Sequence, residues 1–426
     1  MSTAKVEHFE HLRGSVRVPG DKSTSHRALM VSALASGEST IQGLSPGLDV
    51  IATARIMEQL GATINVRDEV VTVVGPSNGL HVSAEAFDCG NSGTTMRLLS
   101  GIVSAIPGEH RLVGDASLSQ RPMDRVAEPL TLMGARVTGR GPRLSAPLEI
   151  IGTATLHGIA YDVPMASAQV KSAILFAALS ASTATTVVEH VRTRPTTEEM
   201  FSRAGVAVVS VDSGDGRSIT IHPGRPLARN WPVPGDPSQA AFFAVLGCIH
   251  PDADIQVLDI DSARERVGFL SVLRRMGATM TLRERDATTS LSVQSSQLAA
   301  TEVRSSEIPS VDEVPVLVVA AAAADGVSRF RDVGELRVKE SDRFEGSLSL
   351  ATKLGCRAWS EGDDLFVEGL GSAERFSNFE VDADLDHRMV MASAVAGCAG
   401  AGCSIAAAQT VESSYPNFFE DLERLA

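Results

Sequence analysis

The sequence is poor in aromatic residues and in positive charge. Phe, Trp and Tyr together make up 4% of its 426 residues, so the core must be built mainly from aliphatic side chains. Lys and Arg number 38 against 52 Asp and Glu, which gives a net charge of −14. Nucleic-acid binding needs clustered cations, so this balance excludes nucleic acid as an expected partner. A small anion is not excluded, because screening over about 8 Å lets a local basic pocket outweigh a distant acidic surface.

Several features that would indicate other functions are absent from the sequence. Its five cysteines lack zinc or redox spacing, so we expect reduced, buried thiols in a cytoplasmic protein; they are Cys89, Cys248, Cys356, Cys398 and Cys403. The first twenty residues have no apolar core, which argues against a secretory signal. The stretches 316–324 and 389–408 are too short or too interrupted by glycine to enter a membrane as spanning helices, and we expect buried helices there. No Ser-His-Asp order, zinc motif or P-loop is present.

One segment recurs along the chain: an amphipathic helix, a glycine, and then a strand, a turn and another strand. The glycines are 71 to 78 residues apart, at Gly61, Gly134, Gly205, Gly277 and Gly355. A glycine directly after a helix favours the left-handed conformation that ends the helix. A sixth copy would end at the C-terminus and take its strand from the N-terminal "HLRGSVRV". Six copies of about 72 residues therefore account for the chain, and alternating strands and helices predict an α/β or α+β fold.

A repeated tetrapeptide divides the chain into halves. Val18-Pro19-Gly20-Asp21 recurs as Val233-Pro234-Gly235-Asp236, 215 residues later, which is three copies of the recurring segment. Pro-Gly pairs interrupt regular structure, and two of them half a chain apart indicate two crossings between domains. We expect one three-copy domain over 21–234 and another over 1–20 plus 235–426, with crossings near 18–21 and 233–236.

Polar segments rich in Ser and Thr precede several apolar helices. They are "KSTSHR" from Lys22, "NSGTT" from Asn91, "SAQ" from Ser167 and "PSQ" from Pro237. Each segment alone indicates no more than N-capping of a helix. In the first three, however, a basic residue lies within or beside the first helical turn, namely Lys22 and Arg27, Arg97, and Lys171. A cation there opposes the helix dipole, so we expect an anion-binding cleft formed by several helix N-termini.

The acid–base candidates lie in the second half of the chain. Asp312-Glu313, the loop Lys339–Arg343 and Asp386-His387-Arg388 each precede a helix. A charged cluster is often only a solvated turn, but charges at the start of an apolar helix lie where solvent access ends. The loop Gly114–Met123 offers one carboxylate and one cation, Asp115 and Arg121, and is more typical of a binding loop.

Five segments together resemble the 5-enolpyruvylshikimate-3-phosphate synthase family, in the family's order and over nearly the whole chain. They are "VPGDKSTSHRAL", "CGNSGTTMRLL", "SAQVKSAILFAAL", "RVKESDRF" and "DHRMVM". The resemblance implies a two-domain inverted α/β barrel of six repeats, three in each domain. It also implies transfer of the enolpyruvyl (carboxyvinyl) group of phosphoenolpyruvate to the 5-hydroxyl of shikimate 3-phosphate, in the shikimate pathway of aromatic amino acid and chorismate biosynthesis.

The resemblance also assigns roles by position. It implies that shikimate 3-phosphate is bound by Lys22, Ser23, Arg27, Ser167, Ala168, Gln169, Arg194, Asp312 and Lys339. It implies that phosphoenolpyruvate is bound by Lys22, Gly93, Arg121, Gln169, Arg343 and Arg388. Asp312 matches the carboxylate at the acceptor hydroxyl and Glu340 the carboxylate beside the reacting methylene, and Lys22 joins them as a catalytic residue.

The implied chemistry explains these residue types. Protonation of the methylene carbon builds positive charge at C2 of phosphoenolpyruvate, the acceptor hydroxyl attacks there, and phosphate leaves from a tetrahedral intermediate. This addition–elimination needs an acid and a base at different atoms, and we expect Glu340 and Asp312 in those roles. Arginines would bind the carboxylate and phosphate groups. No metal or cofactor is required, and we expect a monomer.

Two positions bear on the phosphoenolpyruvate side. Many family members carry a Lys near the C-terminus before an aromatic-Pro pair, but the segment Glu412–Pro416 contains no Lys. Gly93 is retained, whereas an Ala there in some relatives narrows the pocket against glyphosate. We therefore expect inhibition by glyphosate.

Two other functions compete with this interpretation. The sister transferase acting on UDP-N-acetylglucosamine has a Lys-Asn pair near the start and usually a Cys in a mobile loop. Here Ser23 follows Lys22, and 114–123 contains no Cys. A non-catalytic anion-binding scaffold would need cations without carboxylates facing the anion, so Asp312 and Glu340 favour an enzyme.

Overall fold

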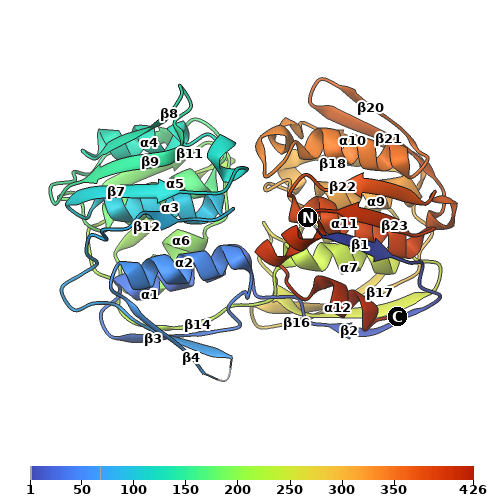
Figure 1. Ribbon diagram of the computed structural model, residues 1–426, viewed down its shortest axis with the longest axis horizontal. Helices are drawn as coiled ribbons and strands as arrows, with labels where there is room; N and C mark the ends of the chain where they lie inside the picture. The colour runs from blue at the N-terminus through green and yellow to red at the C-terminus, as the bar shows by residue number, and fades with distance from the viewer. Residues whose placement is uncertain (1, 68) are drawn as a thin grey trace. The chain divides into compact units, whose positions relative to one another are not determined.

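The computed structural model describes residues 2–67 and 69–426 (Figure 1). The chain divides into two compact units. One comprises the chain up to Asp21 together with Pro234–Ala426, and the other comprises Lys22–Val233. Among the residues described, strands form six sheets, and each unit combines its sheets with helices in a mixed α/β arrangement. No helix in the described ranges is long and apolar enough to cross a membrane.

The Lys22–Val233 unit contains three of these sheets within its described residues, with strand orders β14-β3-β5-β4, β6-β7-β9-β8 and β10-β11-β13-β12. In each, the first pair is parallel and the other pairs are antiparallel. The strands are β3 (Glu38–Gln42), β4 (Thr63–Arg67), β5 (Val70–Val74), β6 (Phe87–Asp88), β7 (Gly108–Val113), β8 (Arg136–Arg140), β9 (Ser145–Gly152), β10 (Ala160–Val163), β11 (Thr185–Glu189), β12 (Val208–Ser213), β13 (Gly216–Ile221) and β14 (Asn230–Pro232). The helices are α1 (Lys22–Leu34), α2 (Leu48–Gln59), α3 (Gly93–Ser104), α4 (Asp124–Leu132), α5 (Ala168–Ala178) and α6 (Thr196–Arg203).

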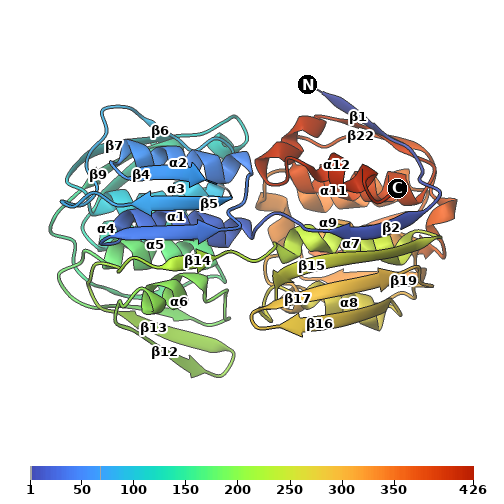
Figure 2. The same ribbon diagram turned by 90° about the horizontal axis from the view of Figure 1, so that it is seen from below.

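The other unit repeats this strand order in β2-β15-β17-β16, which Figure 2 shows from a second side, and in β18-β19-β21-β20. Its third sheet is β22-β23-β1. Its strands are β1 (Thr3–Val6), β2 (Leu12–Val16), β15 (Ala253–Asp261), β16 (Thr279–Arg285), β17 (Thr288–Gln294), β18 (Glu302–Arg304), β19 (Asp325–Arg331), β20 (Arg357–Glu361), β21 (Asp364–Leu370), β22 (Phe379–Asp382) and β23 (Cys403–Ala406). Its helices are α7 (Pro237–Ile249), α8 (Gly268–Arg275), α9 (Val314–Ala323), α10 (Arg343–Lys353), α11 (His387–Ala399) and α12 (Phe418–Glu423).

Each unit has its own aliphatic core around its most apolar helices. In one unit α3 packs against α1 and α5, and in the other α7, α9 and α11 pack against one another. Every residue of α7, α9 and α11 is buried. Helices that are apolar on all sides are stable only when they are covered on all sides, which explains their place inside the units.

The recurring glycines end their helices as expected. All five have positive φ, from 81° at Gly205 to 111° at Gly134. At Gly61, the glycine N–H donates to the Glu58 carbonyl and the next N–H, of Ala62, donates to the Met57 carbonyl. The same pair of bonds recurs after α4, α6, α8 and α10. This is the Schellman arrangement, which needs a residue that tolerates a left-handed backbone.

Two expectations about the chain ends were wrong. The segment "HLRGSVRV" does not complete the sixth copy, because its strand β2 pairs in parallel with β15, Leu12 opposite Ala253. Instead β1 pairs antiparallel with β23, Thr3 opposite Ala406. The stretch 389–408 is also not one helix: α11 ends at Ala399, and the residues from Cys403 form β23. The other stretch, 316–324, forms the buried α9 as expected, apart from its last residue.

The two repeated tetrapeptides pair with each other. Asp21 N–H donates to the Pro234 carbonyl at 2.7 Å, and Asp236 N–H donates to the Pro19 carbonyl at 2.8 Å. The buried guanidinium of Arg266 forms ion pairs with both Asp21 and Asp236. Burial opposes the charge of Arg266, but Asp21 and Asp236 raise its pKa above the ordinary value. One arginine therefore holds both chain crossings.

Candidate active site

The polar segments of the Lys22–Val233 unit lie at the starts of α1, α3 and α5. Ser92 accepts a hydrogen bond from Thr95 N–H, and Ser167 accepts one from Val170 N–H, so the expected N-capping is confirmed for these two. In the fourth segment the cap is Asp236, which accepts from Ser238 N–H.

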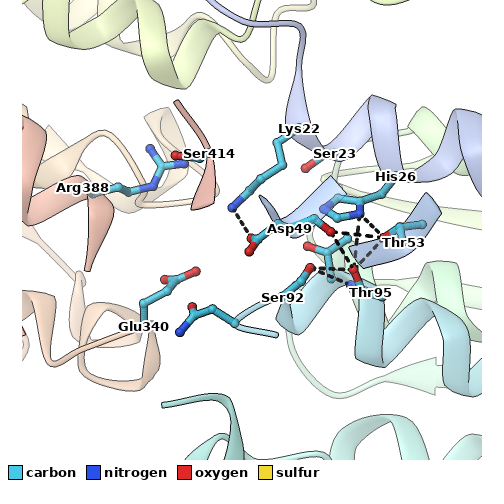
Figure 3. A network of polar contacts seen from close by, with 12 residues as sticks. Lys22, Ser23, His26, Asp49, Thr53, Ser92, Thr95, Glu340, Arg388 and Ser414 are labelled. Carbon is cyan, nitrogen blue, oxygen red and sulfur yellow. Dashed lines mark hydrogen bonds and ion pairs between the residues drawn. The ribbon is translucent and has the colours of Figure 1, made fainter. Parts of the chain in front are cut away.

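Side chains link the first turns of these helices. The ring Nδ1 of His26 lies 2.7 Å from Thr53 Oγ1, which lies 2.7 Å from Thr95 Oγ1 (Figure 3). Gln169 donates to Thr94 Oγ1 at 2.9 Å and accepts from Arg97 at 2.6 Å. Two hydrogen-bonded groups therefore meet at the start of α3, one extending to α1 and α2 through Thr95 and the other to α5 through Thr94 and Arg97.

Two guanidinium groups surround the start of α3. Within this unit Arg121 donates to Asn91 O at 3.1 Å, Asn91 Oδ1 at 2.6 Å and Ser117 Oγ at 3.0 Å. A Cβ added to Gly93 would lie 2.9 Å from Arg97 Nη1 and 3.3 Å from Arg121 Nη1. Gly93 therefore leaves room for both cations beside a helix N-terminus, which is the arrangement expected for binding an anion.

Lys22 and Arg194 border the first turn of α1. Lys22 Nζ lies 3.0 Å from Asp49 Oδ2, a partner that the sequence analysis missed. An acidic residue in the first turn of α2 is what any helix start favours, so nothing in the sequence marked Asp49. Arg194 Nη1 donates to Ser23 Oγ at 3.2 Å. Lys22, Ser23 and Arg194 thus gather around one helix start.

Arg27 and Lys171 occupy more buried positions. Arg27 donates to Ser23 O, Ser172 Oγ and Thr197 Oγ1 at 2.9, 2.8 and 2.6 Å. The expectation that Lys171 contributes to an anion-binding cleft was wrong. Its side chain is 0% exposed, and its ammonium pairs with Glu189 and Glu198 at 3.0 and 2.8 Å. Internal carboxylates, and not a bound anion, neutralise this cation.

In the other unit, one arginine gathers the predicted carboxylates. Arg343 is the first residue of α10, its side chain is 0% exposed, and Asp342 caps the helix by accepting from Glu345 N–H. The guanidinium of Arg343 lies 2.7 Å from the carboxylate of Asp386, 3.0 Å from that of Asp312 and 2.5 Å from that of Glu340. Asp386 was noted as part of a charged segment but not as a site residue, and it also caps α11.

Asp312 is surrounded by cations. Arg388 lies 3.5 Å from its carboxylate and donates to its backbone carbonyl at 3.2 Å. Burial by itself would raise the pKa of Asp312, but Arg388, Lys339 and Arg343 together hold that pKa well below its ordinary value. The carboxylate is therefore ionised at neutral pH. Asp312, Lys339, Glu340, Arg343 and Arg388 form one cluster of charges.

The segment that lacks the family's Lys lies close to α7. Ser414 is buried and accepts a hydrogen bond from Gln239 Nε2 at 3.1 Å. Tyr415 is buried, and its hydroxyl donates to Asp421 at 2.7 Å. Ser238, which precedes Gln239, donates to Glu313. The groups that contact this segment and the start of α7 are thus hydroxyls, an amide and carboxylates.

Comparisons with known proteins agree over the whole chain. Residues 6–422 match the family EPSP synthase (3-phosphoshikimate 1-carboxyvinyltransferase). A 3-phosphoshikimate 1-carboxyvinyltransferase of Prochlorococcus marinus (strain MIT 9303) is 42% identical, with 97% of this chain and 96% of that protein covered. One of Bacillus cereus (strain ATCC 10987 / NRS 248) is 39% identical, with 97% of each covered. An EPSP synthase structure from Acinetobacter baumannii superposes with a TM-score of 0.86 at 36% identity, covering 100% and 98% of the two chains.

Proposed function

The chain belongs to the EPSP synthase (3-phosphoshikimate 1-carboxyvinyltransferase) family, and on that premise we propose how its residues carry out the family reaction. The protein is an enzyme of the shikimate pathway that transfers the enolpyruvyl group of phosphoenolpyruvate to shikimate 3-phosphate. The observation that carries the proposed mechanism is the cluster of Asp312, Glu340 and Arg343, in which one buried guanidinium lies between two carboxyl groups.

Asp312 is the base in this proposal. Its depressed pKa keeps it ionised, so it can accept a hydrogen bond from the 5-hydroxyl of the acceptor and then take its proton during attack on C2. Glu340 is the acid that protonates the methylene carbon and later takes the proton back. A carboxyl group gains its proton more readily beside an added negative charge, and phosphoenolpyruvate brings both a phosphate and a carboxylate. Arg343 would then transfer part of its bonding from Glu340 to the substrate anion.

The remaining residues are assigned to binding one or both of the two substrates. We assign shikimate 3-phosphate to Lys22, Ser23, Arg27, Ser167, Ala168, Gln169, Arg194, Asp312 and Lys339. We assign phosphoenolpyruvate to Lys22, Gly93, Arg121, Gln169, Arg343 and Arg388. The support is the network at the starts of α1, α3 and α5 and the two guanidinium groups beside Gly93. Lys22, held by Asp49, supplies a positive charge for the phosphate that leaves.

The architecture is proposed to be an inverted α/β barrel of six repeats, three in each of the domains 21–234 and 1–20 plus 235–426. Support comes from the recurring strand order and the five Schellman glycines. The boundaries of the compact units fall between Asp21 and Lys22 and between Val233 and Pro234, within a residue of the proposed domain boundaries. A monomer and a cytoplasmic location remain proposals, the latter resting on the five buried free cysteines.

Phosphate release tests the function directly. Purified protein given shikimate 3-phosphate and phosphoenolpyruvate should release inorganic phosphate and form the enolpyruvyl ether, detected by phosphorus NMR. Neither substrate alone should release phosphate, and UDP-N-acetylglucosamine should not replace shikimate 3-phosphate. Release with the nucleotide sugar, or none with the proper pair, would contradict the proposal.

A further inference from the structure

Lys171 is a buried cation that the proposed mechanism does not use. It lies in the first turns of α5 and its side chain is 0% exposed. Its ammonium makes three hydrogen bonds, to Glu189 Oε2 at 3.0 Å, Glu198 Oε1 at 2.8 Å and the Arg194 carbonyl at 3.1 Å. An ammonium has three donors, so this side chain is fully used inside the protein and cannot contact a substrate.

The partners of Lys171 span the loop that carries Arg194. Glu189 is the last residue of β11, and Glu198 lies in the first turn of α6. The loop 190–195 joins these elements, and Lys171 binds the end of the strand, the start of the helix and the backbone of Arg194 between them. The ammonium therefore holds the loop at both ends and at the residue that carries the guanidinium.

The same arrangement reaches α1 through neighbouring residues. Ser172, next to Lys171, and Thr197, next to Glu198, both accept from the guanidinium of Arg27. Their hydroxyl oxygens lie 2.7 Å apart. Arg194 itself donates to Ser23 Oγ. A shift of the loop would consequently move Arg194 against Ser23 and disturb the contacts of Arg27.

A buried ion pair is costly to form, so its use here calls for a reason beyond stability. Desolvation offsets much of the attraction, and such pairs are best explained where they specify geometry. One carboxylate would neutralise the ammonium, but two carboxylates and a carbonyl fix its direction as well. We propose that Lys171 is a positioning residue that orients Arg194 toward the 3-phosphate of the acceptor. This inference rests on the proposed function, because it takes shikimate 3-phosphate as the ligand of Arg194.

The test separates recognition of the two substrates. Lys171→Met keeps most of the side-chain volume and removes all three hydrogen bonds. We expect the KM for shikimate 3-phosphate to rise about tenfold or more, which corresponds to about 1.4 kcal/mol. The KM for phosphoenolpyruvate should change by less than about twofold, because that substrate is assigned to other cations. The exposed Lys353→Met serves as the matched control and should leave both constants unchanged.

Arg194 provides the decisive comparison. In an Arg194→Ala background, Lys171→Met should add less than about twofold to the KM for shikimate 3-phosphate, because residues that act through one contact are not additive. With shikimate, which lacks the 3-phosphate, the turnover of Lys171→Met and of wild type should be equal. Additive effects, or equal losses toward both substrates, would overturn the proposal.

Two further measurements separate the positioning role of Lys171 from other causes of a raised KM. Lys171→Met leaves two carboxylates buried, so a variant that also carries Glu189→Gln and Glu198→Gln removes this charge while still lacking the Lys171 bonds. It should show the same selective rise in KM, and a normal KM would overturn the proposal. Wild-type turnover of both substrates is measured first. Its failure would contradict the proposed function, whereas a normal wild type with an unselective Lys171→Met contradicts only the positioning role.

Discussion

The arginines of the candidate site make different kinds of hydrogen bonds in the two units. In the Lys22–Val233 unit, the bonds that orient Arg97, Arg121 and Arg194 go to amide, carbonyl and hydroxyl oxygens. In the other unit, Arg343 bonds to Asp312, Glu340 and Asp386. A neutral acceptor orients a cation without placing a negative charge beside it, which suits the binding of an anion. Carboxylate partners instead place groups that can accept or donate a proton beside the cation, and these cations hold the pKa of Asp312 below its ordinary value. The first arrangement is suited to binding and the second to acid–base chemistry.

The largest effect is expected from Arg343→Met. Removal of the buried guanidinium leaves three carboxylates without it, and breaking such a buried pair costs about 3–5 kcal/mol of unfolding free energy. Turnover should also be lost, since Asp312 and Glu340 lose their common partner. Urea denaturation and phosphate release check this, with the exposed Arg357→Met as control. A stable, active Arg343→Met would remove the basis of the comparison.

The proton-transfer roles are tested by Asp312→Asn and Glu340→Gln. Each should lower kcat by about 10²–10⁴-fold, the range typical of a lost general acid or base. Shikimate 3-phosphate should still bind, as measured by calorimetry. The exposed Glu345→Gln, close to Glu340 in the chain, should retain full turnover. Normal turnover in both variants would show that the carboxylates only balance charge.

Arg121→Met tests an arginine that donates hydrogen bonds to neutral acceptors. The KM for phosphoenolpyruvate should rise about 10- to 100-fold, since a charge-assisted contact with an anion is lost. The unfolding free energy should fall by no more than about 1 kcal/mol per lost hydrogen bond to a neutral acceptor. Steady-state kinetics and urea denaturation measure both, with the exposed Arg136→Met as control. A larger loss of stability than in Arg343→Met would reverse the comparison.

Gly93→Ala should alter inhibition by glyphosate. The wild type should be inhibited in competition with phosphoenolpyruvate. The added methyl group would lie 2.9 Å from Arg97 Nη1 and 3.3 Å from Arg121 Nη1, so both flexible guanidinium groups must shift. We expect the inhibition constant to rise by about tenfold, as for a contact worth about 1.4 kcal/mol. Gly224→Ala has open space around it and should change nothing. Unchanged wild-type turnover in excess glyphosate at low phosphoenolpyruvate would contradict this prediction.

The smallest effect is the pH dependence that Asp312 contributes to stability. Its folded-state pKa lies below the ordinary 3.8, so its stabilisation is fully present above 3.8 and is lost as the pH falls from there toward the folded-state pKa. Wild type should therefore lose more unfolding free energy than Asp312→Asn between about pH 5 and pH 3. The exposed Glu109→Gln should follow the wild type. If the unfolding free energies of wild type and Asp312→Asn change in parallel with pH, the neighbouring cations do not stabilise the ionised carboxylate of Asp312.

Much of the candidate site could be predicted because its residues lie in short motifs at helix starts. Ser92 and Ser167 act as caps, and Gly93 has the two guanidinium groups beside it. Lys171 lies in the same kind of motif, but the prediction that it contributes to an anion-binding cleft was wrong. The sequence shows that a Lys or Arg lies at a helix start. It does not show whether that long side chain points toward solvent or toward carboxylates of other elements.

The sequence by itself determined where the helices with recurring glycines end. Each Schellman turn depends on about six consecutive residues with one glycine, so its geometry is local and its spacing can be read directly. Only the tertiary structure decided which charges face one another. Lys171 meets Glu189 from 18 residues away, and Arg343 meets Asp386 from 43 residues away. Burial and ion pairing arise when separate elements pack, and β1 takes its place beside β23 for the same reason.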